Sequence, residues 1–149
     1  MLKVISVRHV HADRAGLAGK ERDTLRLTSE ERRWARRRLT TERGREVALA
    51  LPTGSTLRAG DILWVEPDWY LEVEPAPEPV IAVFPGDHAE ALRLAFEVGN
   101  RHFPLALEGK ALLVPDDPAM EQLLTRQGAK WERRTAVFNP IGSGHAHEH

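Results

Sequence analysis

Short apolar stretches separated by glycine and polar turns fill the first half of the chain. Apolar residues recur there at every second position, which is the period of a strand with one buried face. This alternation predicts strands over residues 2–7, 23–28, 45–51, 62–66 and 69–73. Pro67 and Asp68 supply turn chemistry between the last two strands, so these strands should form a hairpin. Several short strands with closely spaced turns indicate a small sandwich-like or barrel-like domain.

The segment Ser29–Leu39 carries two competing patterns. Its composition favours a helix that Ser29 could cap, yet Trp34 and the residues after it alternate as a strand does. We expect a short turn of helix followed by a strand. A turn over residues 42–44 would pair that strand with 45–51.

Strand and helix periods alternate in the second half. The apolar run Val80–Phe84 is bounded by prolines, which is typical of a buried strand. Asp87 is the predicted N-cap of a helix. One face of that helix is apolar at a spacing of three to four residues and carries Ala91, Leu92, Ala95, Phe96 and Gly99.

A hairpin and a second helix follow that first helix. The hairpin turns over residues 108–110, and the helix begins near Asp117 and Pro118. Its predicted buried stripe holds Met120, Leu123 and Leu124, and Gly128 should end it. Residues 130–138 form a last strand. The resulting order β-α-β-β-α-β is that of a ferredoxin-like domain, so the predicted fold class is α+β.

The segment Val73–Val80, with the sequence VEPAPEPV, marks the boundary between the two halves. Its three prolines disfavour a helix or a central strand and predict a short extended linker. We therefore expect a β-rich domain over residues 1–74 and a ferredoxin-like domain over 75–140. A flexible histidine-containing tail is expected over 141–149.

Composition excludes several functional classes. The 149 residues carry a net charge of −1, which gives no global reason to expect nucleic-acid binding. No apolar run is long enough to span a bilayer, and the first residues lack the apolar core of a secretory signal, so we expect a cytoplasmic protein without a membrane partner. The absence of cysteine rules out disulfides, thiolate catalysis and cysteine-held metal sites. Any transition metal must be held by imidazole, carboxylate or backbone groups.

Histidine is concentrated at the end of the sequence. His145, His147 and His149 alternate with other residues, and they make up three of the seven histidines. An extended H-x-H-x-H segment can turn its imidazoles toward one ion, and neutral imidazole suits nickel, copper and zinc. The alternative is a tag remnant or a chance tail, although a tag is usually an unbroken histidine run.

His102 is the second candidate ligand. It follows Gly99-Asn100-Arg101 near a predicted helix C-terminus, where the partial negative charge favours a cation. A lone histidine is more often structural, and one imidazole cannot make a tight metal site. Dimerisation about a two-fold axis would bring His102 near its own copy, and Gly99 would allow a close backbone approach.

The remaining candidate groups carry weaker signals. His9 and His11 would share one side of a strand, or lie in a loop facing solvent, and His88 should lie at the surface. The segment Arg32–Arg38 is rich in arginine, which predicts a salt-bridged face or a docking surface for protein or RNA. Asp116 and Asp117 are accounted for by helix capping. No phosphate-binding, nucleophile-elbow or zinc-protease motif is present, so an enzyme is not expected.

Taken together, these motifs resemble the UreE family of urease accessory proteins, which are nickel metallochaperones. The resemblance covers most of the chain and includes LRAGDIL, VIAVF, AFEVGNRHFPLAL and FNPIGSG. Gly-Asn-Arg-His followed by an apolar stretch is its most specific part. Two departures are visible: LLVPDDPAM holds no histidine where some relatives carry a further pair, and the histidine tail is short.

The resemblance implies a role and a site. It implies an N-terminal domain similar to peptide-binding modules and a C-terminal domain that forms a homodimer. His102 of the two subunits would bind Ni²⁺, with His145, His147 and His149 adding ligands, and Zn²⁺ or Cu²⁺ could substitute in vitro. The implied partners are the urease accessory GTPase complex and apo-urease. The alternative is a protein- or RNA-binding module that uses Arg32–Arg38.

Overall fold

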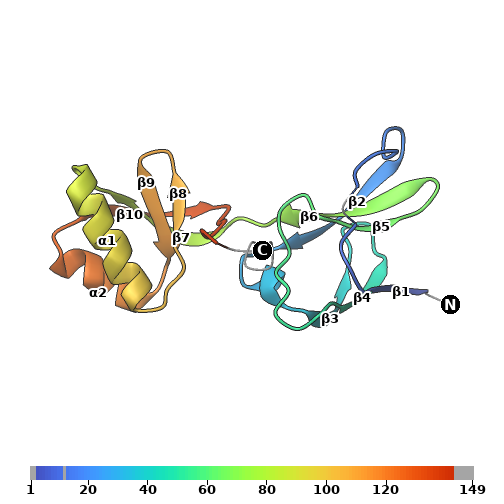
Figure 1. Cartoon of the computed structure of the whole chain (residues 1–149), viewed down its shortest axis with the longest axis horizontal. Coiled ribbons are helices and arrows are strands. Elements are labelled where there is room, and N and C mark those ends of the chain that lie inside the picture. The colour runs from blue at the N-terminus through green and yellow to red at the C-terminus, as the bar shows by residue number, and fades with distance from the viewer. Residues whose placement is uncertain (1–2, 12, 143–149) are drawn as a thin grey trace. The chain divides into compact units, whose positions relative to one another are not determined.

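The computed structural model describes residues 3–11 and 13–142 and divides the chain into two compact units (Figure 1). The first unit ends at Ala76 and the second spans Pro77–Gly142. The expectation of a flexible tail falls mainly on residues 143–149, which lie outside the described residues. The α+β class with two successive folding units is confirmed.

The first unit contains two open three-stranded sheets. One has the order β1-β4-β3, from strands β1 (Val4–Val7), β4 (Glu46–Ala50) and β3 (Arg36–Thr40). The other has the order β2-β6-β5, from β2 (Glu21–Leu27), β6 (Trp69–Pro75) and β5 (Ile62–Val65). The predicted hairpin between β5 and β6 is confirmed, and Glu66 N donates to Trp69 O at 2.8 Å. The pairs β1–β4 and β2–β6 are parallel. Neither sheet closes, so the sandwich form of the prediction holds and the barrel form does not.

Alternating residues of both sheets of the first unit share one apolar core. The core draws on β1 and β4 from one sheet, β2, β5 and β6 from the other, and the loop after β4. Its buried members are Ile5, Val7, Leu25, Leu27, Val47, Leu49, Leu51, Leu57, Leu63, Leu71 and Val73. Burial of this stripe explains the period of two seen in the sequence.

A buried carboxylate, Asp23 on β2, fixes the turn between β3 and β4. It accepts hydrogen bonds from Thr41 Oγ1 at 2.6 Å and from Arg45 Nη1 at 2.8 Å. Burial raises the pKa of Asp23, but these two hydrogen bonds, with others from the backbone N–H groups of Thr24 and Arg43, outweigh that effect. The pKa is therefore held below its ordinary value of 3.8.

The ambiguous segment Ser29–Leu39 forms a 3-10 turn, η1 (Glu31–Arg33), followed by β3, as expected. Arg32 is buried and donates to Leu27 O at 2.9 Å, so it is a structural residue. Arg36, Arg37 and Arg38 are exposed on β3, which is an edge strand.

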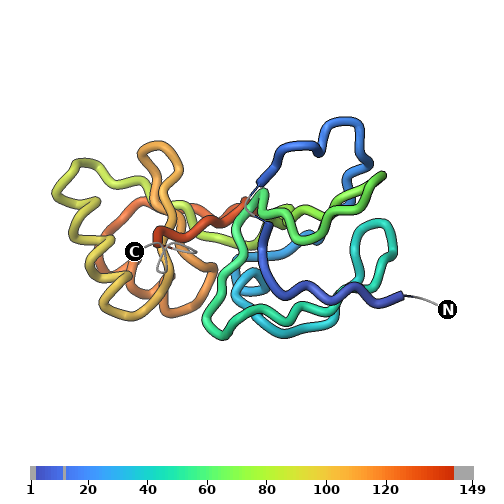
Figure 2. Tube along the Cα trace, turned by 45° about the vertical axis from the view of Figure 1, so that its right-hand side comes forward, coloured from blue at the N-terminus to red at the C-terminus, as the bar shows by residue number. Residues whose placement is uncertain are grey.

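The second unit is an antiparallel sheet covered on one side by two helices (Figure 1). Its elements are β7 (Glu78–Phe84), α1 (His88–Asn100), β8 (Ala106–Glu108), β9 (Ala111–Pro115), α2 (Pro118–Arg126) and β10 (Lys130–Ala136). The sheet order is β10-β7-β9-β8, and the predicted β-α-β-β-α-β succession is confirmed. After β10 the chain returns to the residue before β8, where Ile141 N donates to Leu105 O at 2.7 Å. The red last segment of the trace in Figure 2 follows this return.

Both helices of the second unit start as the sequence predicts, and α2 buries the predicted stripe, whereas α1 buries Leu94 and Val98 in place of its predicted apolar face. Asp87 accepts from Glu90 N at 2.8 Å, and Asp117 accepts from Ala119 N at 2.8 Å. These caps satisfy N–H groups that have no partner within the helix. The helix residues in the core are Leu94, Val98, Met120, Leu123 and Leu124.

The extended linker predicted over Val73–Val80 is wrong in its extent. Strand β6 runs to Pro75 and β7 begins at Glu78, so only Ala76 and Pro77 lie between them. Strands accept proline where no neighbour requires the missing N–H. Pro79 is paired with Thr135 of β10, but on its other side β9 begins to pair with β7 only at Val80.

Candidate metal centre

His102 lies directly after α1 in a backbone conformation that histidine rarely adopts. Its φ of 64° is the one positive φ of a non-glycine residue within the described ranges. His102 N donates to Gly99 O at 2.9 Å, and Phe103 N donates to Val98 O at 3.3 Å. This pair of bonds is the Schellman motif, which ends a helix with one residue in the left-handed region. Val98 and Phe103 pack in the same core, a contact that often accompanies this motif.

The end of α2 shows which residue this position normally takes. There Gly128, with φ of 69°, occupies the equivalent place. Gly128 N donates to Thr125 O at 3.1 Å, and Ala129 N donates to Leu124 O at 3.0 Å. A side chain in the left-handed region costs about 1–2 kcal/mol. The same motif thus ends one helix with the favoured glycine and the other with a strained histidine, and such strain is concentrated at functional sites.

The imidazole of His102 is available for a ligand. The residue is exposed, and its ring makes no hydrogen bond or ion pair with the described part of the chain. Its neighbour Arg101 is held by Glu97, with Nη1 2.6 Å from Oε2. The adjacent guanidinium is therefore engaged elsewhere, and the ring nitrogens of His102 are open to a metal ion.

A single protomer does not supply the remaining ligands from its described residues. No three histidine, aspartate or glutamate residues gather there in a way that could hold a metal ion. His88 lies at the opposite end of α1, which is roughly 20 Å long at 1.5 Å per residue. Asp117 caps α2, and Asp116 pairs with Arg133 at 3.4 Å. The other predicted ligands, His145, His147 and His149, lie outside the described residues.

Beside His102, α1 presents an apolar face that nothing in the second unit covers. The sequence singled out this face, but the core is filled by Leu94 and Val98. Leu92 and Phe96 remain 59% and 67% exposed. A Cβ placed on Gly99 would meet nothing within 4 Å, so the second unit by itself gives no reason for a glycine there.

Each unit has an apolar hollow in its surface. The larger of the two adjoins the uncovered face of α1. That hollow, of ≈ 610 Å³, lies between α1 and the β8–β9 hairpin, and its lining includes Leu92, Leu107 and Ile141. These three residues are each more than half exposed. Contiguous exposed apolar surface of this kind marks a contact site.

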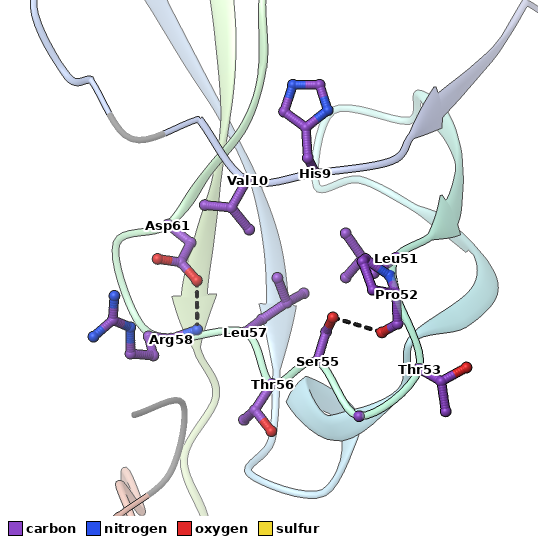
Figure 3. Close-up of a pocket in the computed structure, with 11 residues that line it drawn as sticks. His9, Val10, Leu51, Pro52, Thr53, Ser55, Thr56, Leu57, Arg58 and Asp61 are labelled. Atoms are coloured by element: carbon purple, nitrogen blue, oxygen red, sulfur yellow. Dashed lines mark hydrogen bonds between the residues drawn. The ribbon is translucent and has the colours of Figure 1, made fainter. Parts of the chain in front are cut away.

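The smaller hollow, of ≈ 420 Å³, belongs to the first unit (Figure 3). Its wall is the loop after β4, where Ser55 Oγ donates to Pro52 O at 2.6 Å, and its rim includes His9 and Val10. Arg58 N donates to Asp61 Oδ2 at 2.7 Å and closes the adjacent turn. The His9 ring points away from this loop (Figure 3).

Two groups of residues whose sequence signals were weak have defined positions in the structure. The rings of His9 and His11 have their centroids 5.2 Å apart, a contact that only their spacing of two residues could have indicated. In the basic segment, the Arg37 guanidinium lies 3.5 Å from the ring centroid of Trp34. That ring face is therefore covered by an arginine instead of being open to a base. Among the described residues, no helix has the length and apolarity needed to cross a membrane.

Comparison with known proteins agrees with this architecture. Residues 4–76 match the family model "UreE urease accessory protein, N-terminal domain", and residues 78–149 match "UreE urease accessory protein, C-terminal domain". The urease accessory protein UreE of Ralstonia nicotianae is 39% identical over 119 residues, covering 77% of this chain and 56% of the relative. That of Burkholderia thailandensis is 38% identical over 130 residues, covering 85% and 61%. That of Paraburkholderia xenovorans is 36% identical over 143 residues, covering 93% and 64%.

The chain thus spans about three fifths of the length of these relatives. The two family models meet at the boundary between the two compact units, because one ends at residue 76 and the other begins at 78. Both halves of the family's architecture are therefore present in order. The chain belongs to the UreE urease accessory protein family.

Proposed function

We propose that this chain is a metallochaperone that takes part in urease maturation by carrying Ni²⁺ for the urease active site. Nickel is the cargo and no reaction is catalysed. The observation that carries the proposal is His102, an exposed imidazole held in a strained conformation beside an uncovered apolar helix face. Family membership supports the urease context, and the cysteine-free composition leaves imidazole as the leading ligand type.

The site is completed by a second copy of the chain. An isologous contact centred on the last turns of α1 would cover Leu92 and Phe96 and bring each His102 close to its counterpart. Gly99 lies between Phe96 and His102 along the chain and allows the two backbones to approach. The dimer is thus part of the proposed metal site, since no three possible ligands gather around His102 among the described residues of one protomer.

The tail histidines His145, His147 and His149 are proposed as the further ligands. Imidazole binds metal only when neutral, so protons compete with Ni²⁺ and affinity should fall as the solution becomes acidic. Several single-imidazole ligands can leave one at a time, which suits handover. The receiving partners in this proposal are the urease accessory GTPase complex and apo-urease, and the site of action is the cytoplasm.

The test combines metal titration with mass measurement on the full chain. Ni²⁺ is titrated calorimetrically into the wild type and into His102→Ala, with His88→Ala as the matched control because His88 is also exposed on the second unit. Light scattering reports the oligomer in the same samples. We expect a tight site of one Ni²⁺ per two chains that disappears in His102→Ala and persists in His88→Ala. A tight site that survives His102→Ala would overturn the proposal.

The exposed arginines of β3 favour a second candidate, a module that binds RNA or an acidic protein. Arg36 and Arg38 make no ion pair with the described residues, whereas Arg14, Arg22, Arg26, Arg43 and Arg45 of the same unit each do. A salt-dependent shift with RNA, together with no Ni²⁺ binding, would favour this candidate over the metallochaperone.

A further inference from the structure

His9 and His11 form a pair of adjacent imidazoles in the segment that follows β1. Their ring centroids are 5.2 Å apart and the ring planes are inclined at 41°. Neither residue belongs to the unit that carries His102. The pair therefore belongs to a different unit from the proposed nickel ligand His102, and the sequence indicated only two residues on one side of a strand or in a loop.

The backbone holds this pair in place. His11 N donates to Ile62 O at 2.8 Å, which joins the segment to the start of β5 as an isolated bridge. The chain bends at His9, and the contact between the two rings shows that the side chains of His9 and His11 lie together on one side of this segment. His9 and Val10 both contribute to the rim of the hollow in the first unit, and the His9 ring is turned away from the loop that forms its wall (Figure 3).

The spacing of the rings fits a shared metal ion. With a metal–nitrogen bond of about 2.0–2.1 Å, each ring centroid lies roughly 3.2 Å from the ion. Two rings at a tetrahedral angle are then about 5.2 Å apart, against roughly 4.5 Å at a right angle and about 6.4 Å for linear coordination. The observed 5.2 Å matches the tetrahedral value. It differs from the spacing expected for two neighbouring ligands of an octahedral ion.

We propose that His9 and His11 form a second, two-histidine metal site that takes a tetrahedrally coordinating divalent ion of the Zn²⁺ type. No third histidine, aspartate or glutamate joins them among the residues described, so water fills the other positions. A site with two protein ligands is weaker than a closed four-ligand site and exchanges its ion readily. It needs no second subunit, in contrast to the site proposed at His102.

The test isolates this pair in the full-length chain. Replacing His102, His145, His147 and His149 by alanine leaves three histidines, His9, His11 and His88. ZnCl₂ is titrated into this background by calorimetry, and long-range ¹H–¹⁵N spectra follow the imidazole nitrogens. We expect one Zn²⁺ per chain and metal-induced shifts of the His9 and His11 rings. Because the background lacks every ligand of the proposed nickel site, the two proposals fail independently.

Variants within this background decide the assignment. His9→Ala and His11→Ala should each lower Zn²⁺ affinity at least tenfold, whereas His88→Ala should leave it unchanged. Amide spectra check that each variant is folded. Zn²⁺ binding that persists in the His9→Ala/His11→Ala double variant would overturn the site. A pair that binds Ni²⁺ but not Zn²⁺ would overturn the tetrahedral assignment.

Discussion

Replacing His102 by glycine should change metal binding and folding stability in opposite directions. The residue occupies the left-handed position of a Schellman motif, with φ of 64°. Glycine adopts this conformation without steric cost, as Gly128 does at the end of α2. His102→Gly should therefore abolish the tight Ni²⁺ site and make the metal-free second unit more stable.

The expected size of the stability gain follows from two opposing terms. The left-handed conformation costs a non-glycine residue about 1–2 kcal/mol. Glycine loses more backbone freedom on folding than histidine does, and this entropy loss offsets about 0.5–1 kcal/mol of the strain that is relieved. The exposed ring of His102 makes no hydrogen bond with the described residues, so its loss adds little. The net gain should be about 0.5–1 kcal/mol.

Native-state hydrogen exchange measures this gain in the second unit alone. The buried β7 amides of residues 80–83 report global opening of that unit, and samples are kept free of metal. Gly128→His is the reciprocal control and should destabilise the same amides by a similar amount, because it places a side chain at a φ of 69°. If His102→Gly left protection unchanged or lowered it, the argument that His102 is conformationally strained would be refuted.

Three further predictions test other parts of the structure. Gly99→Ala should raise the free energy of unfolding of the protomer by up to about 1 kcal/mol, because the added Cβ meets no atom within 4 Å. Sedimentation equilibrium should show a weaker dimer for this variant. An unchanged dimer would contradict a close approach of the two backbones at Gly99. Phe96→Asp should leave the protomer folded by circular dichroism, because Phe96 is 67% exposed, and abolish dimerisation; a dimer of wild-type strength would exclude this face. Asp23→Asn should destabilise the first unit by about 1–3 kcal/mol at neutral pH, because Thr41 and Arg45 lose a charged acceptor. Since the folded-state pKa of Asp23 is lowered, its contribution is present above pH 3.8 and lost as pH falls through the folded value, so urea midpoints of wild type and variant should converge in acid.

Local signals in the sequence were sufficient for the element order of the second unit. The capping aspartates Asp87 and Asp117 start both helices as predicted, and Gly128 ends α2. Each of these signals acts within one helical turn, so it does not depend on the rest of the fold. The same holds for the 3-10 turn and strand in the ambiguous segment Ser29–Leu39. Its edge position, however, is set by pairing with β4 alone.

For the candidate metal ligands, the sequence was informative for some residues and not for others. The sequence singled out His102 by its position after a helix, and the structure adds the left-handed backbone and the uncovered helix face beside it. Its role as a ligand, with that of His145, His147 and His149, stays a prediction. The spacing of His9 and His11 indicated that they could share one side of a strand, but the bridge from His11 to Ile62, far along the chain, could not be read from the sequence.

The sequence by itself determined the period of each element, where the helices begin, and which residue types could hold a metal. Only the tertiary structure decided which apolar face of α1 is buried, because Leu92 and Phe96 are as apolar as Leu94 and Val98. It also decided the parallel pairing of β1 with β4, and the continuation of strands through the prolines around Ala76. Periodicity and capping act over a few residues. The choice of face and partner depends on the surface that the rest of the unit offers, and that surface exists only after distant strands have paired.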